Sequence, residues 1–437
     1  MLSAVLDAAL AAVEPAAAVR AALRREHGGF VLGDRNYRLV DLRRVLVVGA
    51  GKASAPMAAA VETLLPHDLP VDGSVTVRYG HAVPTQRVRI REASHPVPDA
   101  AGVEASRAIA DLLEPADERD LVVCVISGGG SALLTLPADG ISLEDLQRTT
   151  DALLRSGATI AEINTLRKHL DLVKGGGLVR LAHPAPVATL VLSDVVGNPL
   201  DAIASGPTVP DSTTWSDAAD VLDRYELWDA VPTSVADRLR AGVQGHLPDT
   251  PKPGDPLFAQ AQTAIVGSNL LACQAAAAAA EGFGLATQVL TTYIEGEARE
   301  VARVLAGLLR EVDASGHPLP RPCCLVAGGE TTVTVRGSGK GGRNQELALA
   351  AAPALHGLAS VMLASIGTDG SDGPTDAAGA WVDGSTIDHA IASGLDPGAY
   401  LRNNDAYTLF DRLGGEHLIR TGPTNTNVND LYVLIAV

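Results

Sequence analysis

The stretch LVVCVISGGGSALL (residues 121–134) places an apolar run directly before Ser127, three consecutive glycines and Ser131. An apolar run of this length that ends in a turn signal is typical of a buried strand, and the residues after the glycines are helix formers. Glycine allows backbone N–H groups to come within hydrogen-bonding distance of phosphate oxygens. The stretch therefore predicts a strand, an anion-binding turn and a helix, with a sharp turn without a ligand as the alternative.

Two further stretches repeat this arrangement, VLVVGAGKASAP (45–56) and VATLVLSD (187–194). A strand-like run at 74–79 and a helix expected near 101–114 lie between them, so short β-rich runs alternate with helices. We predict an α/β fold in which residues 1–250 form an N-terminal Rossmann-like domain, a doubly wound parallel sheet with helices on both faces. Ligands bind outside the carboxyl ends of such strands, so the three turns are expected on one edge.

The second half of the chain predicts another domain. LPDTPKPGDP (247–256) is rich in proline and polar residues, which is typical of a linker. Strand-like and helix-like segments resume after it, including helices expected at 269–281 and 297–312. CCLVAGGETTVTVRGSGKGGRNQE (323–346) brings strand signals close together, which suggests a hairpin or a mixed sheet. We predict a C-terminal α/β domain with a mixed sheet over residues 256–437.

Composition excludes some classes of function. A net charge of −17 argues against nucleic acid and anionic membrane surfaces as partners. The four cysteines lie in apolar runs without a CxxC pair, and no apolar stretch reaches the roughly 20 residues of a membrane span. The N-terminal segment has no basic n-region. We expect a cytoplasmic protein that binds neither nucleic acid nor membrane.

Lysine is rare, with five residues against twenty-nine arginines among the 34 cationic side chains. Four of the five lie in or beside glycine-rich segments: Lys52, Lys168, Lys174 and Lys340. Arginine serves the general surface, so a remaining lysine is expected to act as a compact point charge beside glycine N–H groups. This points to phosphate chemistry; chance survival of surface lysines is the alternative.

The turn at GAGKASAP (49–56) fits neither common nucleotide fingerprint. Ser54 replaces the third glycine of a dinucleotide loop, and Ala53 stands where a Walker A loop has Ser or Thr. What remains is an ammonium group, Lys52, at the start of a helix, where the helix dipole favours a bound anion. A tight turn with an exposed lysine is the alternative.

Four other segments carry candidate site residues. Asp194 and Asp201 follow a strand end and are candidates for holding Mg²⁺ or for capping helices. A helix read through NTLRKHLDLVKGGG would align its cations on one face, which suits an anion or solvent. Arg343 opens a helix, against the helix dipole, which hints at function. The aspartates of 365–379 match no EF-hand loop and are read as Asp-Gly turns. The residues of the helix face are Asn164, Arg167, Lys168, Asp171 and Lys174. The aspartates of 365–379 are Asp369, Asp372 and Asp376.

Seven segments in this order resemble the glycerate 2-kinase family, whose carboxy-terminal half is called the MOFRL domain. They are GAGKAS, SHPVPD, SGGGSALL, NTLRKHL…KGGGL, LSDVVGNPLDAIASGPT, GGETTVTVRGSGKGGRNQE and GTDGSDGPTDAAGA. The resemblance covers nearly the whole chain. It implies two α/β domains with a cleft between them, ATP as co-substrate, Mg²⁺ as cofactor and transfer of the γ-phosphoryl group to the 2-hydroxyl of D-glycerate. Asp171 is a departure, because that position looks more usually occupied by serine.

The resemblance maps the key cations onto Lys52 and Arg343, which are expected to meet across the cleft and act as catalytic residues. Nucleotide phosphates are assigned to Ser127, Gly128, Gly129, Gly130, Ser131 and Lys340. Substrate binding is assigned to Asn164, Arg167, Lys168 and His95, and Mg²⁺ to Asp194 and Asp201. Alanine at Lys52 or Arg343 is expected to cut phosphorylation sharply and leave the fold intact.

Two other functions stay open on the sequence. One is an NAD(P)H-dependent hydroxypyruvate reductase, against which Ser54 in the dinucleotide position argues. The other is a non-catalytic protein that binds a small anion between two lobes. A homodimer is compatible with the sequence, and the choice of the 2-hydroxyl comes from the resemblance alone.

Overall fold

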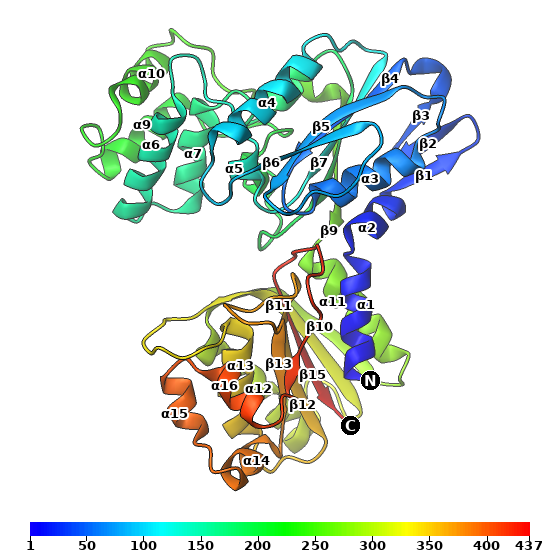
Figure 1. Ribbon diagram of the computed structural model, residues 1–437, viewed down its shortest axis with the longest axis vertical. Helices are drawn as coiled ribbons and strands as arrows, with labels where there is room; N and C mark the ends of the chain where they lie inside the picture. Colours follow the sequence, from blue (N-terminus) through cyan, green and yellow to red (C-terminus); the bar gives the residue numbers. More distant parts are fainter. The chain divides into compact units, whose positions relative to one another are not determined.

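The computed structural model describes all residues, 1–437, and divides the chain into two compact units. Residues 15–266 form the parallel-sheet unit, and residues 1–14 with 267–437 form the mixed-sheet unit. These bounds differ from the predicted domains, 1–250 and 256–437, in two places. The strand β9 (Ala261–Gly267) extends the first sheet, and the N-terminal helix α1 (Leu2–Ala12) packs on α11 (Asn269–Glu281) of the second unit (Figure 1).

The parallel-sheet unit is built on six strands in the order β6-β5-β4-β7-β8-β9. The pairs among β4 to β8 are parallel, which confirms the predicted doubly wound sheet. Their bounds are β4 (Arg44–Ala50), β5 (Val71–Arg78), β6 (Val88–Ala93), β7 (Asp120–Ile126) and β8 (Val187–Leu192). Because β5 and β6 lie on one side of β4 while β8 and β9 lie beyond β7, the strand order reverses between β4 and β7. Ligands of doubly wound sheets bind at this reversal.

Helices cover this sheet. Leu46 and Val48 of β4 alternate into a core with Ile109 and Leu113 of α4, because successive strand residues point to opposite faces. The unit contains α2 (Pro15–Ala22), α3 (Ser54–Leu64), α4 (Ala100–Leu113), α5 (Gly130–Leu133), α6 (Leu143–Ser156), α7 (Ile160–Leu170), α8 (Gly177–Ala182), α9 (Trp215–Arg224) and α10 (Thr233–Val243). Short 3₁₀ turns lie at Leu39–Asp41, Ile203–Ser205 and Pro256–Gln260. A small antiparallel sheet, β1 (Leu23–Glu26), β2 (Gly29–Leu32) and β3 (Arg35–Arg38), completes the unit.

The mixed-sheet unit has six strands in the order β10-β11-β15-β12-β13-β14. Only β10 and β11 pair in parallel, so the predicted mixed sheet is confirmed. The bounds are β10 (Ala286–Glu297), β11 (Cys323–Thr332), β12 (Val361–Gly367), β13 (Gly379–Asp383), β14 (Leu418–Ile419) and β15 (Asp430–Ala436). The helices are α1 and α11 with α12 (Ala298–Ser315), α13 (Arg343–Leu355), α14 (Thr386–Ala392), α15 (Pro397–Arg402) and α16 (Ala406–Arg412).

Of the two alternatives predicted for 323–346, a hairpin or a mixed sheet, the structure has the mixed sheet and no hairpin. Residues 323–332 form the single strand β11, and residues 333–342 contain no helix or strand. The Asn404 side chain accepts hydrogen bonds from Arg336 N and Gly337 N, which occupies donors that a second strand would need. A distant residue therefore holds this segment in an irregular path, and no local sequence pattern predicts that.

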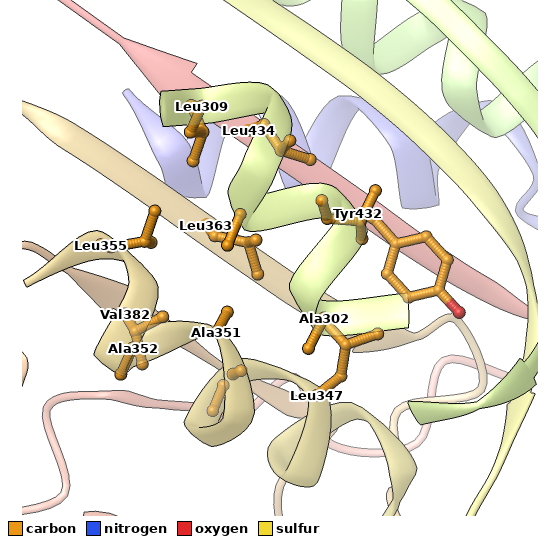
Figure 2. Packing of buried hydrophobic residues seen from close by; sticks show 14 of the residues in the cluster. Ala302, Leu309, Leu347, Ala351, Ala352, Leu355, Leu363, Val382, Tyr432 and Leu434 are labelled. Carbon is orange, nitrogen blue, oxygen red and sulfur yellow. The ribbon is translucent and has the colours of Figure 1, made fainter. Parts of the chain in front are cut away.

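Small side chains allow the helices of the mixed-sheet unit to approach their sheet closely. Ala302 of α12 and Ala351 of α13 lie within the same buried cluster as Leu363 of β12 and Leu434 of β15 (Figure 2). Such close packing makes the cluster sensitive to volume, so truncating one of its leucines to alanine costs about 2–5 kcal/mol. This core fixes the N-terminus of α13, where Arg343 lies.

No single helix in the structure combines the length and the apolarity needed to cross a membrane; α1 and α2 meet that test only when counted together. All four cysteines are free and buried.

Candidate functional site

Two turns interlock where the strand order of the parallel sheet reverses. The backbone N–H of Lys52, after β4, donates to the carbonyl oxygen of Gly128, after β7, at 2.9 Å. The Ser127 hydroxyl accepts from Ala53 N at 2.9 Å and lies 3.1 Å from the Ser54 hydroxyl. Ser127 therefore holds the two turns together, and its predicted contact with phosphate stays a prediction.

Glycine is required where these turns meet. Gly51 has φ +142°, and a Cβ there would lie 2.1 Å from the Ser127 hydroxyl oxygen. Gly129 has φ +87°, and a Cβ there would lie 2.9 Å from Cδ2 of His95. The left-handed backbone and the close approach both exclude larger residues. The predicted glycine turns are thus the structural requirement for bringing Lys52, His95 and the 128–131 backbone together.

Lys52 has an unpaired, half-buried ammonium group. Its Nζ makes no hydrogen bond or ion pair in the structure. Burial and the positive charges of Lys52, Arg78 and His81 lower the pKa of His95 to about 4, so this imidazole is neutral at pH 7. An ammonium without a counter-ion beside a neutral imidazole is poised to receive an anion.

The other four lysines are engaged. Lys168 pairs with the buried Asp211 at 3.1 Å, and Lys174 donates to the carbonyl oxygens of Ser131 and Leu134. Lys252 bonds within its own loop, and Nζ of Lys340 lies 4.1 Å from the ring centroid of Tyr407. Lys168, predicted as a substrate ligand, is therefore placed to hold structure.

The predicted cationic helix face is only partly correct. The helix α7 ends at Leu170, so Asp171 and Lys174 lie beyond it. Asp171 instead accepts hydrogen bonds from Leu136 N and Val173 N, at 3.0 and 2.9 Å, and lies 3.5 Å from Lys174 Nζ. The buried Asp171 carboxylate thus fixes the backbone of the chain after the helix.

Asn164 and Arg167 lie on α7, and Asn164 is connected through Ser205 to Ser131 of the glycine turn. The Ser205 hydroxyl donates to Asn164 Oδ1 at 3.0 Å and lies 3.1 Å from the Ser131 hydroxyl. Arg167 makes one hydrogen bond, at 3.4 Å to Asn164 Oδ1, and burial lowers its pKa. Arg167 lines a small pocket that Ser131 also lines. Four unused N–H donors of a guanidinium in a pocket suit a carboxylate.

The two aspartates predicted to hold Mg²⁺ differ in their surroundings. A Cβ on Gly128 would lie 2.0 Å from Asp194 Oδ2, so the Asp194 carboxylate packs directly against the glycine turn. Asp201 is half-exposed and lies 3.7 Å from Lys168 Nζ. The structure contains no group of three His, Cys, Asp or Glu side chains arranged to hold a metal ion. One carboxylate beside a phosphate turn nevertheless fits Mg²⁺, which is often held by one or two carboxylates together with substrate phosphates and water.

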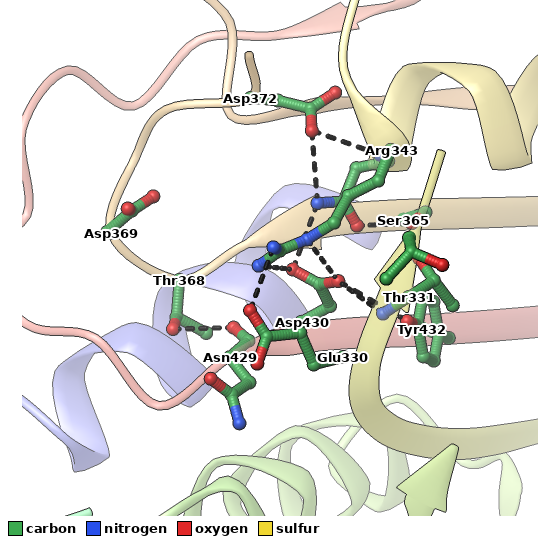
Figure 3. Close-up of polar contacts among 12 residues, drawn as sticks. Glu330, Thr331, Arg343, Ser365, Thr368, Asp369, Asp372, Asn429, Asp430 and Tyr432 are labelled. Carbon is green, nitrogen blue, oxygen red and sulfur yellow. Dashed lines mark hydrogen bonds and ion pairs between the residues drawn. The ribbon is translucent and has the colours of Figure 1, made fainter. Parts of the chain in front are cut away.

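Arg343 lies in an ion-pair cluster at the start of α13. Its guanidinium donates two hydrogen bonds to Asp430, at 2.8 and 2.9 Å, and one to Glu330 at 2.9 Å (Figure 3). Burial opposes its charge, but the Asp430 and Glu330 carboxylates raise the pKa of Arg343 above its ordinary value. Asp372 supplies the negative charge that a helix N-terminus favours, by accepting from Asn344 N and Gln345 N at 3.0 and 2.8 Å. The arginine that opposes the dipole is thus compensated by its carboxylate neighbours.

The three aspartates of the 365–379 segment do not converge. Asp372 is buried as the cap of α13, and burial raises its pKa to about 6. Asp376 accepts from Tyr407 and Arg420, and Asp369 accepts from Ser371 N within its own turn. Asp372 thus caps a helix and Asp369 holds a turn, so the prediction of Asp-Gly turns is correct in part, whereas Asp376 binds two side chains distant in sequence.

The parallel-sheet unit is thus a doubly wound sheet whose glycine turns and Lys52 ammonium lie at its switch point. Residues 1–240 match the family model described as domain of unknown function (DUF4147), and residues 323–430 match the MOFRL family. The D-glycerate 2-kinase of Thermotoga maritima is 44% identical over 91% of this chain and 92% of its own length. A putative hydroxypyruvate reductase of Agrobacterium vitis is 43% identical over the whole of this chain and 94% of its own length.

The crystal structure of a glycerate kinase from Thermotoga maritima matches with a TM-score of 0.88 and 42% identity, covering 99% of this chain and 98% of that one. The chain therefore belongs to the glycerate 2-kinase family with a MOFRL domain, as the seven sequence motifs in their order predicted.

Proposed function

We propose that this protein is an ATP-dependent glycerate 2-kinase that phosphorylates D-glycerate on its 2-hydroxyl. The observation that carries the proposal is the unpaired Lys52 ammonium between two glycine turns at the sheet's switch point. Phosphoryl transfer demands positioning and neutralisation of negative oxygen more than covalent chemistry from the protein. Lys52 supplies that charge, and backbone N–H groups of the Gly128–Ser131 turn other than Gly130 N, which already donates to Ser127 O, supply hydrogen bonds.

Each proposed ligand has a defined task. Lys52 stabilises the phosphoryl group during transfer, and Arg343 is the second proposed catalytic cation, whose positive charge the Asp430 and Glu330 carboxylates stabilise. Arg167 and Asn164 bind the carboxylate of D-glycerate in the pocket beside Ser131. His95, neutral at pH 7, orients the substrate by hydrogen bonding without adding charge.

Asp194 is the residue proposed to hold Mg²⁺, since its carboxylate packs against Gly128 of the phosphate turn. When bound, Mg²⁺ neutralises part of the charge on the nucleotide phosphates. Asp201 is less suited, because Lys168 already pairs with it.

The decisive experiment measures ADP release from ATP with and without D-glycerate. The proposal predicts release that depends on D-glycerate, and an enolase-coupled assay that accepts the product directly as 2-phosphoglycerate. Oxidation of NADH by hydroxypyruvate without ADP release would instead establish the reductase, a name that two relatives carry. No turnover in either assay would leave the anion-binding protein as the function.

Two broader features are part of the proposal. We place the protein in the cytoplasm, which four free cysteines support. A homodimer, which is compatible with the sequence, is tested directly by sedimentation of the purified chain.

A further inference from the structure

Two basic side chains at the end of β5 have no partner in the protein. Arg78 is the last residue of β5, and His81 follows in the same turn. Neither the Arg78 guanidinium nor the His81 ring makes a hydrogen bond or an ion pair. The nearby acids serve other groups, since Glu92 accepts from Gly80 N at 2.7 Å and Asp99 accepts from the Tyr79 hydroxyl at 2.8 Å. The turn is therefore held in place while both basic groups stay available.

Strand pairing brings this turn to the Lys52 site. Gly51 N donates to the carbonyl oxygen of Thr76 at 3.1 Å, which ties the lysine turn to β5 two residues before Arg78. On the other side of β5, Arg78 pairs in register with Ala93, two residues before His95. The positive charges of Lys52, Arg78 and His81 all act on the His95 ring, whose burial is the larger effect.

Like charges repel one another, so three neighbouring basic groups that form no ion pair favour a ligand with several negative charges. The carboxylate of a hydroxy acid carries a single charge, and Arg167 already lines the pocket proposed for it. A polyphosphate carries three or four charges along a short chain, and a guanidinium binds phosphate through two parallel hydrogen bonds. The chemistry of the cluster therefore matches the nucleotide rather than the acceptor substrate.

We propose that Arg78 and His81 bind the polyphosphate of the nucleotide, extending the phosphate site of Lys52 and the Gly128–Ser131 turn. This inference rests on the proposed function. It makes Arg78 a determinant of nucleotide affinity, separate from the residues that bind D-glycerate.

The test is calorimetric titration of the full-length protein with ADP and with inorganic tripolyphosphate. Arg78→Ala is expected to weaken both by at least about tenfold, because charge-assisted hydrogen bonds are lost. Arg78→Lys should recover part of the affinity, and His81→Ala should weaken binding less. Arg89→Ala is the matched control, since Arg89 is an exposed, unpartnered arginine on the neighbouring strand β6. The affinity of this variant for ADP and tripolyphosphate should stay within twofold of wild type. In steady state, KM for ATP should rise in Arg78→Ala while KM for D-glycerate stays unchanged.

Unchanged ADP affinity in Arg78→Ala, or a rise confined to KM for D-glycerate, overturns the inference. A wild-type protein that binds neither ADP nor tripolyphosphate overturns it as well. If the wild type binds ADP but never transfers phosphate to D-glycerate, the proposed function fails, and the loss of ADP affinity in Arg78→Ala still decides the inference by itself.

Discussion

Replacing Arg343 by alanine should destabilise the mixed-sheet unit as well as the activity. Asp430 is 0% exposed and receives two hydrogen bonds from the guanidinium. After truncation it keeps a hydrogen bond from Asn344 Nδ2 at 3.0 Å and weaker contacts at 3.4 Å. Removing one partner of a buried ion pair costs about 3–5 kcal/mol. Because the Arg343 side chain is 32% exposed, water can reach the vacated space, and we expect the lower value, about 3 kcal/mol.

Hydrogen exchange of backbone amides in β15 measures this effect. A loss of about 3 kcal/mol corresponds to exchange on the order of 10²-fold faster, if these amides exchange through opening of the unit. The double variant Arg343→Ala/Asp430→Asn removes the stranded charge and should recover most of the protection. Lys52→Ala should leave exchange unchanged, because its Nζ has no partner. Wild-type exchange in Arg343→Ala, or no recovery in the double variant, would refute the reasoning. The sequence-based expectation that alanine at both positions spares the fold is thus retained only for Lys52.

Three more predictions follow from single contacts. The pKa of Asp372 is about 6 in the folded protein against an ordinary value of 3.8, so the folded state binds this proton more tightly and stability falls as pH rises from about 4 to 6. In urea unfolding, the wild type should lose up to about 3 kcal/mol relative to Asp372→Asn across that window. Parallel pH dependences of the two proteins would contradict this. Ser127→Ala leaves Ala53 N–H buried without an acceptor, which should lower the free energy of unfolding by about 1–3 kcal/mol in a thermal melt; an unchanged melting temperature would show that the hydroxyl is dispensable. Gly128→Ala puts a Cβ 2.0 Å from Asp194 Oδ2, so the Mg²⁺ concentration for half-maximal ADP release should rise about tenfold. Gly307→Ala serves as control, because a Cβ there enters open space. An equal Mg²⁺ requirement in both variants would exclude Asp194 as the metal ligand.

Segments with strong hydrophobic patterns could be predicted closely from the sequence. The helix expected at 269–281 coincides with α11, and the runs at 45–50 and 121–127 coincide with β4 and β7 to within a residue. Prediction failed where distant residues decide the path. After β11 the Asn404 side chain accepts a hydrogen bond from Arg336 N, and after the end of α7 at Leu170 the Asp171 carboxylate accepts one from Leu136 N. Those partners lie 35 residues or more apart in sequence, beyond any local pattern.

The same distinction applies to the candidate site. Lys52 and the Gly128–Ser131 turn were predictable because a strand end, glycines and a lysine are adjacent in sequence. The engagement of Lys168 by Asp211 was not predictable, because it depends on a residue 43 positions later. Arg78 and His81 were missed because nothing local separates them from other surface residues. Only strand register places them beside the lysine turn.

The most direct test of the whole account is the single-turnover rate of phosphoryl transfer from ATP to D-glycerate in Lys52→Ala, beside Lys52→Arg. We predict a fall on the order of 10³-fold or more for alanine, with partial retention for arginine and wild-type hydrogen exchange in both. A rate for Lys52→Ala within tenfold of wild type would contradict the claim that this ammonium neutralises the transferring group.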